Sequence, residues 1–232
     1  MKKTIFIISV LVATLAIAQT PNTLTDKEKK DGWQLLFDGK STKGWRNYRS
    51  KTLNPQWKVQ DGALIFTEKG GGDIVTNDEF ENFELAIEWK ISDCGNSGIF
   101  YNVVEDTASW AGAVYSSGPE MQVLDDKCHP DNELETHRAG ALYDMVPLSK
   151  PAVKPAGQWN KAVLKINKGK AEHWLNDIKV VEYTLWTPEW DAMVAKSKFN
   201  GWQGFGKFKK GHLALQDHGD VVSFRNIKIR KL

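Results

Sequence analysis

The sequence has few cysteines and almost no excess of either charge. Only Cys94 and Cys128 occur among 232 residues, and 31 basic side chains stand against 29 acidic ones. Such a balanced charge provides no electrostatic footprint for nucleic acid or for anionic lipid. We therefore expect neither nucleic acid nor a membrane surface as a partner.

The motifs of two common kinds of catalytic centre are also missing. The cysteines do not form a CxxC pair and the histidines show no HxH or HExxH spacing, so no zinc site is indicated. No G-x-S-x-G motif occurs, which disfavours a serine hydrolase. A divalent metal ion held by oxygen ligands and one histidine stays open. The histidines are His129, His137, His173, His212 and His218.

Long apolar runs are confined to the N-terminus. A basic "MKK", an apolar "TIFIISVLVATL" and a small-residue "AIA" predict a signal peptide over residues 1–18, cleaved after Ala18. Removal of Lys2 and Lys3 leaves 29 basic and 29 acidic residues. Residues 19–31 form a polar leader and residues 32–232 one domain. The mature chain is expected in the periplasm or outside the cell, free of the membrane, where Cys94 and Cys128 either pair or remain two free thiols.

The remaining pattern is all-β. "WKVQDGALIF" (57–66) places an Asp-Gly turn between two short apolar runs, which predicts a hairpin. Alternation in "FELAIEWKI" (83–91) predicts a strand with one buried face. The only helix expected covers 188–199, with Pro188 at its start. Many short strands with turns between them indicate a two-sheet sandwich or jelly roll. Further strands are predicted at 97–104, 120–124, 140–146, 161–167, 171–177, 179–185, 211–218 and 223–230.

Two of the predicted strands carry unusual polar residues on the face away from the core. In "EMQVL", Met121 and Val123 suit a core, which leaves Glu120 and Gln122 on the other face. In "GHLALQDH", the leucines take the core side, and Gln216 and His218 share the opposite side. Outer faces of this kind are often simply solvated. We favour a site here, because both strands repeat an amide beside an ionisable group.

Further candidates surround this predicted face. Asn96 lies in a Gly-flanked bend where backbone can approach a ligand. Only one of His173 and Trp174 can point toward the side of the predicted face, because they are neighbours on one strand and successive side chains of a strand point in opposite directions. Each of these residues also has an ordinary structural explanation as a turn, a solvated side chain or an ion-pair partner. The residues that we expect close to the face are Asn96, Tyr143 and Trp174. Those that we expect at its rim are Asp125, His129, His137 and Arg138.

A conventional two-carboxylate glycosidase is disfavoured by the same strand. Retaining glycosidases need two carboxylates roughly 5 Å apart. The same-face neighbour of Glu120 is Gln122, which does not ionise. Asp125 has the wrong parity unless a β-bulge intervenes.

Several blocks, in this order, resemble the 3-keto-disaccharide hydrolase domain family: "GWQLLFDGKSTKGW", "GNSGIFY", "GPEMQVLDD", "AGALYD" and "LALQDHGDVVSFRNIKIR". The resemblance extends from about Asp31 to the C-terminus. It implies a concanavalin A-like jelly roll, export, and action on glycosides oxidised to a ketone at C3. Cys128 beside His129 in "DDKCHPD" is not a feature of that family.

The implied chemistry fits a site without a carboxylate pair. A ketone at C3 acidifies the C2 hydrogen, so a base can remove it, the aglycone leaves from C1, and water then adds to the enone. Such an enzyme needs a base, an acid and an enolate stabiliser. We predict His218 as base and Glu120 as acid, with the amides of Gln122, Gln216 and Asn96 holding the sugar. A lectin-like carbohydrate-binding module and a conventional glycosidase remain alternatives. The same sandwich, aromatic side chains and amides would also serve a sugar-binding groove, although we expect only one or two of the ten tryptophans to contact a ligand.

Overall fold

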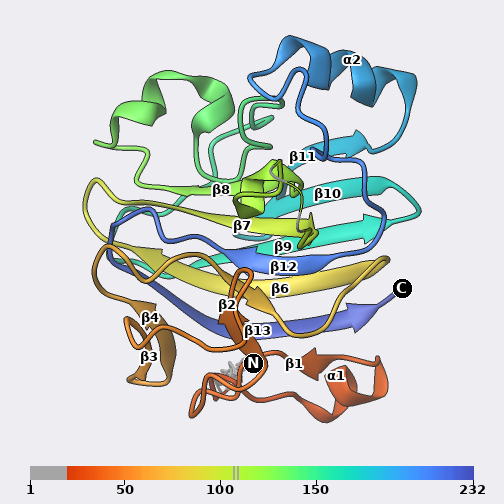
Figure 1. Cartoon of the computed structure of the whole chain (residues 1–232). Helices are drawn as coiled ribbons and strands as arrows, with labels where there is room; N and C mark the ends of the chain where they lie inside the picture. Colours follow the sequence, from red (N-terminus) through yellow and green to blue (C-terminus); the bar gives the residue numbers. More distant parts are fainter. Residues whose placement is uncertain (1–19, 107, 109) are drawn as a thin grey trace, which may run out of the picture.

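In the computed structural model, which describes residues 20–106, 108 and 110–232, two antiparallel sheets pack face to face (Figure 1). The first has the order β11-β10-β9-β6-β13-β4-β3, and β1 also pairs with β13. This confirms the predicted all-β sandwich. Its strands are β1 (Gln34–Leu35), β3 (Trp57–Gln60), β4 (Ala63–Phe66), β6 (Phe83–Ile91), β9 (Asn160–Asn167), β10 (Lys170–Leu175), β11 (Ile178–Thr184) and β13 (Val222–Lys231).

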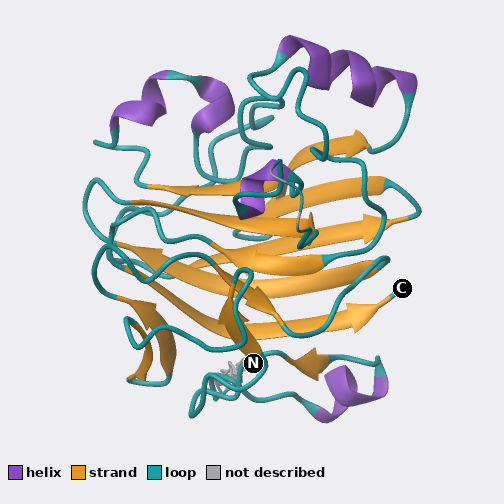
Figure 2. Cartoon of the chain, viewed as in Figure 1, coloured by secondary structure: helices purple, strands orange, loops and turns teal. Residues whose placement is uncertain are grey.

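The second sheet is smaller and carries the predicted polar face. Its order is β2-β5-β12-β7-β8, so strands that are distant in the sequence lie side by side. Helices are few, and most of the chain outside the strands is loop (Figure 2). The strands are β2 (Trp45–Asn47), β5 (Ile74–Thr76), β7 (Asn96–Val103), β8 (Glu120–Leu124) and β12 (His212–Leu215).

The core lies between the sheets and follows the alternation in the sequence. On β6, the buried residues are Phe83, Leu85, Ile87, Trp89 and Ile91. Glu88 and Lys90 alternate with the last three of them and are half-buried on the outer side. The expected hairpin forms as β3 and β4. Its turn takes positive φ at both central positions, which is the geometry that Asp-Gly favours.

One histidine belongs to this core. His173 on β10 is fully buried, where Nδ1 donates to the Gly140 carbonyl oxygen (3.0 Å) and Nε2 accepts from the Tyr183 hydroxyl (3.3 Å). Burial lowers the pKa of His173 to about 4, so the ring is neutral at neutral pH. His173 is therefore a structural residue.

Four local predictions need correction. The segment 140–146 is not a strand, because positive φ at Gly140 and Asp144 turns it back into a Leu142–Val146 bridge. The strand predicted at 211–218 ends at Leu215 as β12. The predicted helix is α2 (Pro188–Lys196), capped by the Thr187 hydroxyl and shorter than expected. A second helix, α1 (Asp26–Lys30), forms in the polar leader.

The leader packs on the sandwich. The Asn22 amide nitrogen donates to the Gly62 carbonyl oxygen (2.7 Å), and its backbone N–H donates to Asn226 Oδ1 (2.6 Å). The predicted signal peptide lies outside the described residues. Within the described residues, no helix is long and apolar enough to span a bilayer.

The outer face of the five-stranded sheet is divided into two parts. One part is covered by the loop between β7 and β8, whose short helical turn η1 (Val114–Ser116) places Val114 on Val75, Phe100 and Ala214. This turn is yellow-green in Figure 1. The other part is left open and forms the cavity described next.

Candidate active site

A cavity of ≈ 470 Å³ opens on the uncovered part of this face. Its size falls within the usual range of small-molecule sites. Six of the residues predicted near the site line it together, including the four that define the predicted face. The lining residues are Asp73, Asn96, Tyr115, Glu120, Gln122, Tyr143, Lys198, Phe199, Trp202, Gln216, Asp217 and His218.

Strand register explains why these side chains meet. Residues directly opposite each other on antiparallel strands share a face, and Gln122 lies opposite Gly98. The Gln216 N–H donates to the Gly98 carbonyl oxygen (3.1 Å), which places Gln216 beside the same position. Leu213 and Leu215 belong to the core, so the predicted parity of this strand is confirmed.

Gly98 makes room for the carboxyl group of Glu120. A β-carbon added to Gly98 would overlap with Glu120 Oε1 and crowd the Phe100 ring. The glutamate side chain therefore lies across the backbone of β7. Any side chain at position 98 would displace it.

Glu120 is an unpaired buried carboxyl group. It is 7 % exposed, and among the described residues it forms no ion pair. Burial raises its pKa to about 8, against a weaker opposing effect of the Lys198 ammonium. In the orientation that satisfies its amide, Gln122 donates to Glu120 Oε1 (3.0 Å) and to the Ser97 carbonyl oxygen (3.0 Å). Glu120 is thus held as a protonated acid at neutral pH.

A loop beyond β12 carries the other predicted catalytic residue, His218. Asp217 fixes this loop, because its carboxylate accepts from the backbone N–H groups of Gly70 (3.1 Å) and Gly72 (2.7 Å). The Asp217 N–H in turn donates to Asp73 Oδ1 (2.9 Å). His218 itself is exposed at the edge of the cavity. It is therefore accessible to a substrate.

Asp73 is the second carboxyl group of the cavity with a shifted pKa. Burial is the main cause and the neighbouring Asp217 carboxylate adds to it, raising the pKa of Asp73 to about 6. At neutral pH, Asp73 is therefore ionised while Glu120 is protonated.

Lys198 is the single Lys or Arg among the described residues that line the cavity. Its ammonium group lies 4.0 Å from the centre of the Tyr143 ring. The Tyr143 hydroxyl donates to Asp131 Oδ2 (3.3 Å), and burial, with the Asp131 and Glu120 carboxyl groups, raises the pKa of Tyr143. Tyr143 therefore stays neutral, and Lys198 supplies positive charge.

Two of the four predicted rim residues, His137 and His129, contact side chains that line the cavity. His137 is buried, bonded to Asp144 Oδ1 (3.1 Å), and its ring centre is 4.3 Å from that of Tyr143. His129 contacts His218 edge to face, with ring centres 6.1 Å apart. Arg138 donates to the Asn132 carbonyl oxygen (3.0 Å). None of the three lines the cavity within the described part of the chain.

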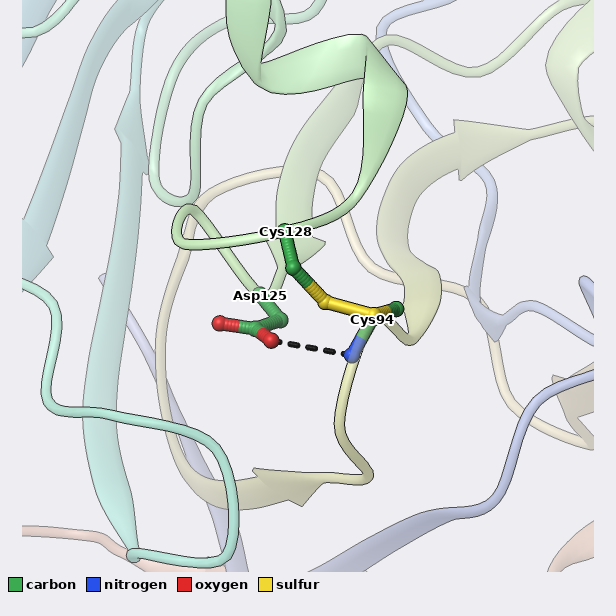
Figure 3. A group of neighbouring side chains, drawn as sticks. All are labelled: Cys94, Asp125 and Cys128. Atoms are coloured by element: carbon green, nitrogen blue, oxygen red, sulfur yellow. Dashed lines mark hydrogen bonds between the residues drawn. A yellow bond between two sulfur atoms is a disulfide. The ribbon is translucent and has the colours of Figure 1, made fainter.

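Asp125, the fourth rim candidate, has a structural role beside the disulfide bond. Its Oδ2 accepts from the Cys94 backbone N–H (2.9 Å), as Figure 3 shows, and its Oδ1 accepts from the Lys127 N–H (3.1 Å). Cys94 and Cys128 are paired, which settles the alternative left open by the sequence. The β7–β8 pairing runs in continuous register, so Asp125 is not moved beside Glu120 by a bulge.

The structure does not bring Trp174 to the cavity. It lies on β10 of the eight-stranded sheet, where its indole N–H donates to Glu172 Oε2 (2.9 Å) and its ring borders a separate hollow with Val163 and Lys165. Its neighbour His173 points into the core. Neither residue faces the cavity, because their strand belongs to the other sheet.

Among the described residues, two groups of side chains have the spacing that a metal ion would require. One contains Cys94 and Cys128, which are used up in the disulfide bond. The other is His129, His218 and Asp220, whose ligand atoms lie within 4.8 Å of one another. Exposed groups at this spacing are common on protein surfaces, so the cluster alone does not define a metal centre.

Sequence reasoning missed six lining residues. Trp202 had a signal, because an aromatic residue in the turn sequence "NGWQG" has no strand or helix to bury it. Asp217 lies between two residues that were predicted. No local signal in the sequence marks the other four, because only the folded chain brings their loops to this face. They are Asp73, Tyr115, Lys198 and Phe199.

Known proteins that are similar to this chain indicate its family. Residues 32–230 match the model of the 3-keto-alpha-glucoside-1,2-lyase-like domain. A curated relative from Bacteroides thetaiotaomicron, named 3-keto-disaccharide hydrolase, is 39% identical over 229 residues, covering 87% of this chain and 79% of that protein.

Solved structures extend the likeness to the fold. A candidate glycosyl hydrolase from Parabacteroides distasonis is 32% identical, with a TM-score of 0.85, over 92% of this chain and 100% of the other. A Bacillus subtilis protein of unknown function with a galectin-like fold is 12% identical, with a TM-score of 0.55, over 82% and 90% of the two chains. The latter supports the concanavalin-like sandwich alone. The chain therefore belongs to an enzyme family, that of the 3-keto-alpha-glucoside-1,2-lyase-like domain.

Proposed function

We propose that this enzyme cleaves the glycosidic bond of 3-keto-glycosides, including 3-keto-disaccharides, by elimination followed by hydration. The family and the name of the curated relative support action on glycosides. The observation that carries the proposal is Glu120, a buried carboxyl group with a pKa of about 8 that lines a cavity rich in neutral amides. A protonated acid and an exposed histidine meet the needs of proton transfer.

In the first step, His218 as the neutral imidazole takes the C2 hydrogen as a proton. The electron pair of the broken C–H bond moves to the C3 oxygen and forms an enolate. Lys198 and the amides of Gln122 and Gln216 line the cavity and stabilise this negative charge. Such preorganised groups act most strongly in a site that is shielded from water.

In the second step, the enolate electrons form the C1–C2 double bond as the C1–O bond breaks. Glu120 donates its proton to the departing oxygen, so the aglycone leaves as a neutral alcohol. Water then adds across the enone, hydroxyl to C1 and hydrogen to C2, with Glu120 and His218 acting in reverse. The balance is one glycoside and one water giving one 3-keto sugar and one alcohol.

A conventional glycosidase is the second candidate, and one observation favours it. Glu120 and Asp73 line the same cavity with pKa values of about 8 and about 6, which is the pattern of an acid beside an ionised carboxylate. Such an enzyme would cleave an unoxidised glycoside. The earlier pairing of Glu120 with Asp125 does not enter, because Asp125 is bound to backbone N–H groups elsewhere.

One assay separates these functions. The protein is incubated with a glucoside and with the same glucoside oxidised at C3, and released aglycone is measured. Cleavage of the 3-keto form alone is expected. Cleavage of the unoxidised form would support the glycosidase, and binding without cleavage of either form would support a lectin-like module.

We also propose that the chain is exported, since a disulfide bond links Cys94 and Cys128 and such bonds persist in oxidising compartments. The protein isolated from the periplasm or medium should begin at Gln19. Recovery from the cytoplasm with Met1 retained would contradict export.

A further inference from the structure

Two exposed aromatic side chains border the cavity. Tyr115 of η1 is 42% exposed and Trp202, in the loop after α2, is 37% exposed, and both line the cavity. Their ring centres are 6.1 Å apart and their planes are tilted by 49°. Glu120 and Gln122 are 7% and 1% exposed. The cavity therefore has a polar, buried floor and an aromatic mouth.

The position of Trp202 is fixed by a stack of rings that reaches the core. Its ring meets Phe199 edge to face at 5.2 Å, and Phe199 stacks on Phe205 at 3.8 Å. Phe205 in turn stacks on the buried Trp190 at 6.2 Å. The Trp202 backbone N–H also donates to the Phe199 carbonyl oxygen (3.0 Å), which fixes the turn that carries the ring. An exposed ring held this firmly loses little conformational entropy when a ligand binds it.

The reacting ring of a substrate must lie on the floor, because the acid Glu120 lies there. The departing group then extends toward solvent, where Tyr115 and Trp202 stand. A pyranose ring has apolar C–H faces and a polar rim, and an aromatic ring with one face exposed matches those C–H faces. Trp202 also borders a neighbouring hollow of ≈ 500 Å³ that contains Asn200 and Gln203, so the mouth continues in that direction.

We propose that Tyr115 and Trp202 form the binding site for the leaving group, and that this leaving group is a sugar ring stacked on Trp202. The inference rests on the proposed function, because it takes the position of the reacting ring from the role of Glu120. It makes the enzyme selective for 3-keto-glycosides whose aglycone is itself a sugar. Binding energy from this ring is available to the reaction at the floor.

The test compares two substrates that share the reacting ring. A 3-keto-disaccharide carries a sugar as leaving group, and a methyl 3-keto-glucoside carries only methanol. Trp202→Ala should lower kcat/KM about tenfold on the disaccharide, mainly through KM, and leave the methyl glycoside unchanged. Trp202→Phe should recover most of the loss. Tyr115→Ala, at a more exposed ring, should show the same selectivity with a smaller effect.

Trp33→Ala is the matched control, because Trp33 lies near Arg230 of the eight-stranded sheet, away from the cavity. It should not alter the ratio of the two kcat/KM values. Equal losses on both substrates in the Trp202 and Tyr115 variants, or no loss on either, would overturn the proposed leaving-group site. If the wild-type protein cleaves neither 3-keto substrate, the proposed function fails, and the inference fails with it.

Discussion

Glutamate side chains on the two outer faces of the sandwich lie in opposite environments. On the eight-stranded sheet, Glu84 accepts from Arg230 Nε (3.0 Å) and Glu88 from Arg225 Nε (2.7 Å), across neighbouring strands. On the five-stranded sheet, Glu120 occupies an equivalent outward position, but its hydrogen-bond partner is the neutral Gln122. On the eight-stranded sheet, the Glu84 and Glu88 carboxylates form ion pairs with arginines and stabilise the sheet. The five-stranded sheet leaves a carboxyl group unpaired and buried, where its proton can be used.

The largest expected effect breaks this contrast directly. Glu120→Gln and His218→Ala should each lower turnover of a 3-keto-glycoside by about 10²–10⁴, because each removes a proton-transfer group. Glu84→Gln is the matched control on the other sheet and should keep wild-type turnover. Steady-state kinetics and circular dichroism of the three variants check this. Near-wild-type turnover in both site variants would show that the cavity is not the active site.

A smaller effect is expected from Gly98→Ala. The added methyl group displaces the Glu120 carboxyl group, and a shift of this kind costs up to about 10² in rate. Gly157→Ala is a suitable control, since Gly157 has a φ of 77° and open space around it. That variant should lose stability through strain but keep its turnover. Equal kinetics of the two variants would contradict the placement of Glu120 over Gly98.

The unpaired carboxyl group should also appear in the pH dependence of stability. Folded Glu120 has a pKa of about 8, against 4.5 for an ordinary glutamate, so the folded protein keeps a proton that the unfolded chain releases. Its contribution to stability therefore falls as pH rises from 4.5 to about 8 and is constant above that. As pH rises across this window, the melting temperature of the wild type should therefore fall relative to that of Glu120→Gln. If the difference between the two melting temperatures is instead the same at every pH in this window, the pKa of Glu120 is not shifted.

The smallest effect concerns the paired face. Arg230→Gln removes the partner of Glu84 and should lower the free energy of unfolding by about 0.2–1 kcal/mol, because the pair is partly exposed. Turnover should stay unchanged. Urea unfolding gives the free energy, and a loss of turnover would show that the two faces are coupled.

Local alternation predicted the part of the site that lies on β8 or directly after β12. Glu120 and Gln122 were found because Met121 and Val123 fix the parity of β8, and Gln216 because Leu213 and Leu215 fix that of β12. Parity does not say to which sheet a strand belongs, and this is why Trp174 was misplaced. Positive φ at Gly140 and Asp144 ended another predicted strand.

The rest of the site depends on long-range topology. Asp73 precedes β5, which is paired with β12 despite their distance in the sequence. Lys198 and Trp202 come from the segment after α2, and Tyr115 comes from the loop that carries η1. No local pattern specifies that these segments meet over β8. The family resemblance supplied the chemistry that the local patterns left open.

The most direct test of the account is the pKa of Glu120 itself. Infrared difference spectra between the wild type and Glu120→Gln isolate the C=O stretch of this one protonated carboxyl group as pH is varied. The account predicts that the band persists through neutral pH and disappears with a midpoint near 8. A midpoint near 4.5, the ordinary value for glutamate, would show that Glu120 is ionised at neutral pH and cannot be the proton donor.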